Sequence, residues 1–310
     1  MALIGRQFID AVVAIGTRSS DGSPQWMATG FIFFVPTGQQ ASGQAGHRCY
    51  LVTNRHVLQG QRAIVLRFNP NTPANPVDFD VELNDQLGAV WAAHPDADVD
   101  VAAMGFNVSV LQQQGLNFGA LASENSFTLE QMRDAGVFEG DSVYIVGFPM
   151  GLNTPAMQYA IVRFGCVARI RDAYDAKRGP FLVDASVFPG NSGGPVFLRP
   201  EVAALQGTKA IGESKLVGIV HAYVPYIDAA ISQQTGRPRV IFEENSGLAR
   251  VESVDRILEA CAAAQAQWDL RAARQTPSTQ SQDESQAGAD AVANAAGSGS
   301  ERLEPAVRDD

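Results

Sequence analysis

Three short segments carry side chains suited to nucleophilic chemistry, and they follow one another in the order histidine, aspartate, serine. The serine, Ser192, lies in the run Pro189–Pro195, where glycines on both sides of it allow a tight turn with positive φ. Successive backbone N–H groups in such a turn can converge on an anion. The N–H groups of Gly190 and Ser192 could therefore hold the oxyanion that forms when the serine hydroxyl attacks a carbonyl.

A histidine and a carboxylate that could serve this serine lie earlier in the chain. His56 ends the segment Thr53–His56, which follows an apolar run. Of three aspartates in the next segment, Asp100 leads directly into an apolar run, so we expect it inside the protein, with Asp96 and Asp98 on the loop side. A buried carboxylate needs a partner, and a histidine N–H in that role would also fix the tautomer of the imidazole.

Short strands must position these segments. Apolar runs of roughly four to eight residues recur between Gly, Pro, Asn and Asp. About ten such runs predict an all-β sandwich or a pair of barrels, and not an α/β sheet. A short helix is predicted after Thr128, which could form a capping box with Gln131, and Gly136 could end it. We place the junction between the two strand-rich halves near residues 122–140.

A longer helix is predicted after the second group of strands, over residues 246–274. Apolar side chains recur there at helical spacing, with charged side chains on the other face. The apolar positions are Leu248, Val251, Val254, Ile257, Leu258 and Cys261. Asn245 and Ser246 offer capping oxygens. We expect the apolar stripe to pack against a barrel, and docking of a partner on this helix is the alternative.

The last residues, 275–310, form an acidic tail. They contain seven acidic and two basic side chains, no aromatic residue, and much Ala, Ser, Gln and Gly. Such a segment cannot bury enough apolar surface to offset its ordering entropy, so we expect it to be disordered. It is interpreted as a solvated tail, and recruitment of a partner is the alternative.

The composition disfavours several classes of protein. The formal net charge is -10, which is unsuited to a nucleic-acid-binding surface. No run of about eighteen apolar residues is present, so neither a transmembrane helix nor a membrane partner is expected. The three cysteines include no CxxC pair and no zinc-ligand spacing, so no metal or organic cofactor is predicted. Met1–Gly16 lacks the features of a signal peptide, and we expect a cytoplasmic protein with His47 and His94 solvated on surface loops.

The three segments, in this order, resemble the motifs of the chymotrypsin-like (trypsin-fold) serine peptidases. That family has T-x-x-H at the base, D-[IVL]-A at the carboxylate and G-[DN]-S-G-G-P at the nucleophile. Thr53–His56, Asp100–Ala102 and Gly190–Pro195 match these motifs. The order of the three groups differs from that of the subtilisins and the α/β-hydrolases.

The resemblance covers roughly residues 8–245 and implies a fold. We expect two six-stranded antiparallel β-barrels, residues 1–122 and 141–245, with the connection 123–140 between them. The C-terminal helix and the disordered acidic tail would follow. Gly147–Pro149 and a later strand look like the bacterial HtrA-like branch, although we expect no PDZ domain of the kind that branch carries.

The resemblance also implies an activity. A serine endopeptidase would hydrolyse polypeptides through an acyl-enzyme, with Ser192 as nucleophile, His56 as the group that takes and returns the proton, and Asp100 as the group that orients His56. A catalytically silent trypsin-fold protein that acts as a binding or scaffold module is the alternative.

The family also suggests which residues contact the substrate side chain. The residue six before the nucleophile lies at the floor of the specificity pocket, and an acid there selects Lys or Arg. Here that residue is Ser186, so we expect cleavage after small or medium uncharged residues. Tyr223 would narrow the entrance. His221, on the same strand, could read an acidic side chain or could pack beside the triad.

One further position bears on activation. Asn191 stands where secreted relatives have an Asp that pairs with an amino terminus freed by proteolysis. An amide cannot form that ion pair, but it can brace the turn through local hydrogen bonds. We therefore expect the chain to need no N-terminal cleavage.

Overall fold

The computed structural model describes residues 4–39, 45–153, 157–176, 179–201 and 209–275. The chain divides into two units, Met1–Asp269 and Leu270–Asp310, and the architecture below is that of the first. Of the acidic tail predicted to be disordered, residues 276–310 lie outside the described residues, and Gln275 ends a helix. No helix in the described part of the chain is long and apolar enough to cross a membrane.

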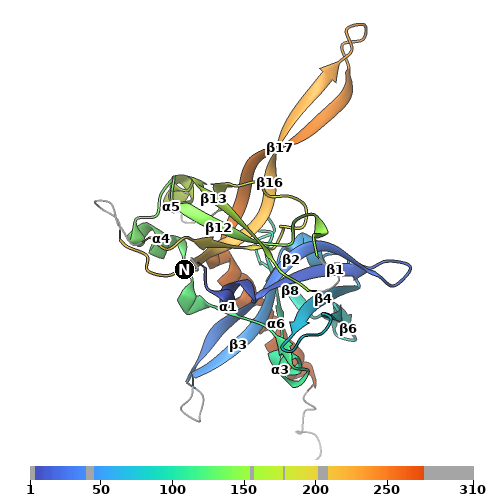
Figure 1. Ribbon diagram of the computed structural model, residues 1–310, viewed down its shortest axis with the longest axis vertical. Coiled ribbons are helices and arrows are strands. Elements are labelled where there is room, and N and C mark those ends of the chain that lie inside the picture. The colour runs from blue at the N-terminus through green and yellow to red at the C-terminus, as the bar shows by residue number, and fades with distance from the viewer. Residues whose placement is uncertain (1–3, 40–44, 154–156, 177–178, 202–208, 276–310) are drawn as a thin grey trace, which may run out of the picture. The chain divides into compact units, whose positions relative to one another are not determined.

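Six antiparallel strands close into a barrel in the second half of the chain (Figure 1). In order around the ring they are β12 (Ser142–Gly147), β13 (Ile161–Arg169), β14 (Phe181–Asp184), β17 (Pro238–Ser253), β16 (Lys215–Ile231) and β15 (Pro195–Leu198). Because side chains alternate between the two faces of a strand, Val143 and Ile145 both point inward and share one apolar cluster with Val183 and Val196. This barrel confirms the predicted six-stranded second barrel.

The first half of the chain forms the other predicted β unit, a curled half-barrel sheet of nine strands that does not close into a ring as the second barrel does. Its strands are β1 (Val12–Arg18), β2 (Pro24–Gln39), β3 (Ala45–Thr53), β4 (Ala63–Pro70), β5 (Val77–Glu82), β8 (Trp91–Ala93), β9 (Ala102–Gly105), β10 (Leu116–Asn117) and β11 (Leu121–Ala122). The order is β10-β4-β1-β2-β3-β9-β8, with β5 and β11 as branches on β4 and β2. The end strands β8 and β10 have only three and two residues, too few to complete a ring. A separate ribbon pairs β6 (Asn84–Asp85) with β7 (Gly88–Ala89).

Short helices connect the strands. They are α1 (Arg6–Ile9), α2 (Arg55–Leu58), α3 (Val108–Gln113), α4 (Leu129–Ala135) and α5 (Arg171–Ala176), with 3-10 turns η1 (Ser123–Asn125) and η2 (Pro149–Gly151). α4 is the predicted helix between the two halves. Thr128 and Gln131 form its capping box, and Gly136 ends it in the left-handed conformation at φ 78°.

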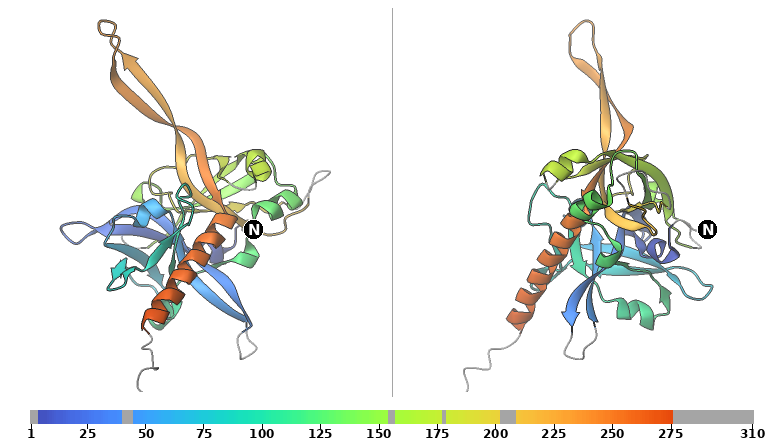
Figure 2. Two further views of the ribbon diagram at one scale, coloured as in Figure 1. Left: turned by 180° about the vertical axis from the view of Figure 1, so that it is seen from behind. Right: turned by 90° about the vertical axis from the view of Figure 1, so that its left-hand side faces the viewer.

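The C-terminal helix α6 spans Val254–Gln275, so it begins later than predicted. Residues 246–253, which we assigned to the helix, lie in β17, where residues 248–251 pair with β14 and residues 249–253 pair with β16. That pairing satisfies their backbone groups, so the three-residue apolar spacing does not produce a helix there. The helix that follows buries Val254 and Cys261 in one cluster with Phe31 of β2, as expected for a packing face (Figure 2).

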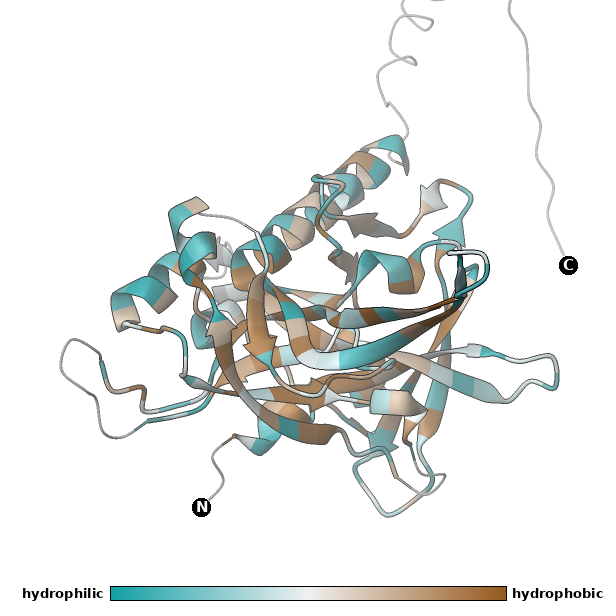
Figure 3. Cartoon of the chain, turned by 90° about the horizontal axis from the view of Figure 1, so that it is seen from above, coloured by the Kyte–Doolittle hydropathy of each residue, from teal (hydrophilic) through white to brown (hydrophobic). Residues whose placement is uncertain are grey.

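One apolar cluster joins the two halves. The ring of Phe8 stacks on that of Phe197 in β15, with centroids 5.7 Å apart, and both belong to the cluster of Phe31 and Val254. Figure 3 shows hydrophobic residues concentrated along the strands and hydrophilic residues on many of the turns and helix surfaces. Burial of this shared surface excludes water between the halves and sets their relative position within the first unit.

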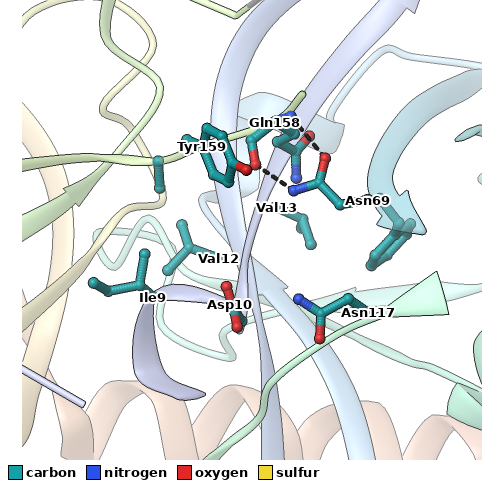
Figure 4. Close-up of a pocket in the computed structure, with 10 residues that line it drawn as sticks. Ile9, Asp10, Val12, Val13, Asn69, Asn117, Gln158 and Tyr159 are labelled. Carbon is teal, nitrogen blue, oxygen red and sulfur yellow. Dashed lines mark hydrogen bonds between the residues drawn. The ribbon is translucent and has the colours of Figure 1, made fainter. Parts of the chain in front are cut away.

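A polar contact adds to this junction (Figure 4). The Asn69 side-chain amide donates to the Gln158 carbonyl oxygen at 2.5 Å, and the Gln158 N–H donates to Asn69 Oδ1 at 2.7 Å. The adjoining cavity, beside Asp10 and Asn117, has about 20 Å³, which fits one water molecule and no substrate.

β16 and β17 continue beyond the barrel as a long hairpin (Figure 1). Their pairing extends from Gly218 and Ser253 to Ile231 and Pro238. Exposed apolar side chains, including Ile227 of β16, lie along the projecting part. The base of this hairpin is where β16 approaches the serine turn described next.

Candidate active site

Strand pairing brings His56 and Asp100 together. β3 and β9 pair so that Thr53 lies opposite Ala102. His56 follows β3 in the first turn of α2, and Asp100 precedes β9, so both side chains leave the sheet at the same edge. His56 Nδ1 and Asp100 Oδ2 are 2.5 Å apart, and the backbone N–H of His56 donates to Asp100 Oδ1 at 2.9 Å.

The environment separates Asp100 from the neighbouring aspartates. Its side chain is 10% exposed, whereas that of His56 is 52% exposed. Burial opposes ionisation of Asp100, but hydrogen bonds from His56 and the nearby charges of His56 and His221 outweigh it and hold the pKa of Asp100 below its usual value. Asp96 and Asp98 are exposed, and Asp96 Oδ1 accepts the Asp98 N–H.

The serine turn depends on two glycines. Gly190 has φ 99° and Gly193 has φ 83°, a region that side chains with a Cβ rarely adopt. A Cβ on Gly190 would also collide with the Phe148 carbonyl oxygen, and one on Gly193 with the Thr29 carbonyl oxygen. The turn therefore packs directly against backbone on both sides.

Hydrogen bonds tie this turn to both halves of the molecule. The Thr29 N–H of β2 donates to the Ser192 carbonyl oxygen at 2.9 Å, and Thr29 Oγ1 donates to the Gly190 carbonyl oxygen at 2.6 Å. The Gly193 N–H donates to the Val220 carbonyl oxygen of β16 at 3.0 Å. Ser192 is thus held between the sheet that carries His56 and the second barrel.

The peptide between Pro189 and Gly190 has a defined orientation. The Met150 N–H donates to the Pro189 carbonyl oxygen at 2.6 Å. In a planar trans peptide the N–H points away from the carbonyl, so the Gly190 N–H faces away from Met150. The N–H groups of Gly190 and Ser192 have no hydrogen-bond acceptor among the described residues.

Asn191 braces the same turn from within. Its backbone N–H donates to the Phe188 carbonyl oxygen at 2.9 Å, and its side-chain Oδ1 accepts the Phe188 N–H at 3.1 Å. Asn191 is 1% exposed. The turn is therefore closed by neighbouring groups, and these contacts involve no charge.

One pocket of about 260 Å³ holds both His56 and Ser192. The other lining residues are Val187, Phe188, Pro189, Asn191, Val220, His221, Ala222 and Tyr223. No lining residue is acidic or permanently cationic.

The residues predicted to contact the substrate side chain are placed differently from one another. His221 and Tyr223 line the pocket, and the Tyr223 hydroxyl donates to Glu243 Oε1 at 2.6 Å, an interaction that raises the pKa of Tyr223. Ser186 is exposed and is not among the residues that line the pocket.

The structure adds residues that sequence reasoning did not single out. Thr29 and Met150 both hold the serine turn, and neither belongs to a motif. Met150 has φ 56°, the one positive value for a non-glycine residue in the described chain, and this strain is a usable signal only once a structure exists. Glu252, which lies beside His221, is the third residue that was not singled out from the sequence.

The described residues contain no group of three or more His, Cys, Asp or Glu side chains that could hold a metal ion. Cys49, Cys166 and Cys261 are free thiols, and burial raises the pKa of Cys49 to about 12.

Two comparisons with known proteins bear on this site. The family model described as a trypsin-like peptidase domain matches residues 28–201, a stretch that contains His56, Asp100 and Ser192. A search of curated proteins found no match to the chain.

Proposed function

We propose, from the premise that this chain belongs to the family of trypsin-like peptidase domains, that it is a serine endopeptidase with His56, Asp100 and Ser192 as its triad. The observation that carries the proposal is the shared pocket: Ser192 lies in it beside His56, whose other ring nitrogen is bonded to a buried carboxylate. The Asp100 carboxylate accepts from Nδ1, so Nδ1 carries the proton and Nε2 keeps a lone pair.

The reaction would be acyl transfer to Ser192 and then to water. Ser192 Oγ attacks the peptide carbonyl carbon while its proton passes to His56 Nε2. The C–N bond then breaks, and the amine leaves with that proton. Water attacks the resulting ester by the same route in reverse, releasing the acid and restoring the hydroxyl. Asp100 stabilises the imidazolium in both halves of the reaction.

The developing oxyanion would lie against the N–H groups of Gly190 and Ser192. Preorganised donors of this kind contribute about 3–4 kcal/mol to the stability of the transition state. Because Met150 already turns the Pro189–Gly190 peptide, we propose that the resting protein needs no peptide flip to form this hole.

Activation would follow the same logic. The local bonds between Asn191 and Phe188 brace the turn without a terminal ammonium group, so the intact chain should be active without removal of its first residues. Mass spectrometry of the active preparation would establish an intact N-terminus. Activity that arises only after those residues are removed would contradict the role given to Asn191.

A fluorophosphonate probe tests the proposal against a silent binding protein, because it labels a serine only when that serine is activated. Wild type should be labelled on Ser192, and Ser192→Ala should not. Failure of wild type to react, with the protein folded by its melting transition, would favour the binding module. The HtrA-like branch, the cytoplasmic location and a partner for the helix or the tail stay predictions.

A further inference from the structure

A second histidine, His221, faces the same oxygen of Asp100 that His56 uses. His221 Nε2 is 3.5 Å from Asp100 Oδ2. His221 lies at a bulge in β16, where the register with β17 shifts between Val220 and Ala222. Bulges of this kind redirect a side chain. His221 consequently points to Asp100 and still borders the pocket.

A buried glutamate stands behind this histidine. Glu252 of β17 places Oε1 3.3 Å from His221 Nδ1, and Glu252 is 1% exposed. Neither Glu252 Oε2 nor His221 Nδ1 has a hydrogen-bond partner among the described residues, so the 3.3 Å approach is a charge contact between two groups that still lack a hydrogen bond. An ionised carboxylate at such a position is costly unless a cation or a donor accompanies it, and His221 is the group that can supply one.

Two carboxylates at 3.3 Å and 3.5 Å from the two ring nitrogens favour one proton more than a neutral imidazole and a carboxylate would hold. If the single proton of a neutral ring is on Nε2, facing Asp100, the lone pair of Nδ1 faces Glu252, unless that side carries a further proton. That proton belongs either to an imidazolium beside a carboxylate or to a carboxylic acid beside a neutral ring. Without it, the remaining proton is drawn to Nδ1, and a lone pair on Nε2 faces the Asp100 carboxylate.

We propose that His221 and Glu252 are positioning residues that share one proton and present the Nε2–H of His221 to Asp100, which holds that carboxylate in line with His56. The effect of this pair on rate rests on the proposed peptidase activity, whereas the proton itself does not. The titratable groups that face His221 are Asp100, ahead of β9, and Glu252, on β17; His56 faces it through Asp100.

Three variants separate this role from packing or substrate contact. Glu252→Gln keeps the shape and can donate an amide proton to His221 Nδ1, and His221→Phe removes the donor to Asp100. Glu259→Gln is the matched control, because Glu259 pairs with a different histidine, His94, away from the pocket.

The first readout is the pH profile of kcat/KM on an uncharged peptide. In wild type the rate should fall on the alkaline side as the shared proton is lost. In Glu252→Gln the rate near neutrality should stay within about threefold and the alkaline decline should be absent, since the amide keeps its protons. His221→Phe should lower kcat about tenfold with KM changed less than threefold, the loss expected for one charge-assisted hydrogen bond. Glu259→Gln should keep the wild-type profile.

A second readout does not need turnover. In Ser192→Ala protein, the downfield proton NMR signal of the His56–Asp100 hydrogen bond should persist with Glu252→Gln and shift or broaden with His221→Phe. The His221 ring nitrogens should lose a proton at lower pH in Glu252→Gln than in its parent.

The proposal is overturned if Glu252→Gln retains the wild-type alkaline decline, or if His221→Phe changes only KM or side-chain preference. It is also overturned if the downfield signal is unchanged in His221→Phe and the His221 ring nitrogens titrate alike in Glu252→Gln and its parent. Absence of fluorophosphonate labelling in wild type would instead overturn the proposed peptidase activity. The NMR result alone would then show whether His221 and Glu252 share a proton. If His221→Phe does not fold, His221→Gln, whose amide nitrogen can occupy the place of the imidazole Nε2 and donate to Asp100 but cannot titrate, should fold and lack the alkaline decline.

Discussion

Two histidine–carboxylate pairs have the same nitrogen–oxygen distance but differ in which of the two side chains is buried. In the pocket, His56 and Asp100 approach to 2.5 Å, with an exposed imidazole on a buried carboxylate. Away from the pocket, His94 Nε2 and Glu259 Oε2 also approach to 2.5 Å, but His94 is 3% exposed and Glu259 is 47% exposed. Distance alone therefore does not separate the proposed catalytic pair, His56 and Asp100, from the second pair, His94 and Glu259.

The two pairs differ in whether the second ring nitrogen of the histidine is hydrogen-bonded. His94 Nδ1 accepts the backbone N–H of Asp96 at 3.0 Å, so its proton is on Nε2 and both ring nitrogens are used. Arg256 further compensates Glu259 at 2.6 Å. His56 has the other tautomer, with the proton on Nδ1 and Nε2 open to the pocket. One pair leaves a base available, and the other ties two segments of the fold together.

The largest expected effect follows from removal of a member of the proposed triad. His56→Ala, Asp100→Asn and Ser192→Ala should each reduce kcat/KM about 10³-fold or more, and combinations should not add, because the three groups act as a unit. Asp100→Asn fails because an amide does not hold the Nδ1–H tautomer. The exposed Asp98→Asn is the control and should stay within about threefold. A severe loss in Asp98→Asn with a mild loss in Asp100→Asn would show that the carboxylate is misassigned.

The charge around each pair predicts a smaller effect on specificity. The cationic Arg256 side chain donates a hydrogen bond to Glu259. The pocket that holds His56 has no acidic lining residue that could pair with a cationic substrate side chain in the same way. A buried Lys or Arg side chain would lose its hydration without a partner, so substrates with Lys or Arg before the cleaved bond should have kcat/KM values about tenfold or more below those with Ala or Val. A peptide-library profile measures this, and one dominated by Lys or Arg would refute it.

The same contrast shows what could be predicted from the sequence. His56, Asp100 and Ser192 could be located because each borders a strand or a glycine-rich turn that has its own local pattern. His94 was predicted to be solvated, and this is wrong: it follows β8 and is buried against Glu259, which lies on a helix far along the chain.

Partners that are distant in sequence also explain two details that local patterns did not predict, the start of the C-terminal helix and the open edge of the first sheet. Val251 fits a helical stripe and a strand equally well, and only its pairing with Phe181 and Val220 decides between them. Closure of the first sheet depends on which short strands find partners, and no residue of β8 or β10 encodes that outcome locally.

The structural pair should affect stability more than rate. His94→Ala removes a buried ring that makes two hydrogen bonds, so it should lower the free energy of unfolding by about 1–3 kcal/mol in denaturant titrations. The fluorophosphonate labelling rate of the folded fraction should stay within about twofold. His47→Ala is the control, since that ring is exposed and 3.7 Å from Glu124, and it should change stability by less than about 0.5 kcal/mol. A His94→Ala variant that melts like wild type but is not labelled would contradict the assignment of His94 and Glu259 as a structural pair.

The smallest effect concerns the acid side of the stability profile. Burial raises the pKa of Glu259, but hydrogen bonds and charges from Arg256 and His94 outweigh it and leave the pKa below the ordinary value of 4.5. A carboxyl with a depressed folded-state pKa stabilises the protein above its unfolded pKa, and that contribution disappears as the pH falls through the folded value. Glu259→Gln should therefore be less stable than wild type near neutrality, and the difference should shrink as the pH drops below about 4.5. Paired melting curves of the two proteins across this range cancel the contributions of other carboxyls, and a difference that stays constant with pH would show that Glu259 acts through shape and not through its charge.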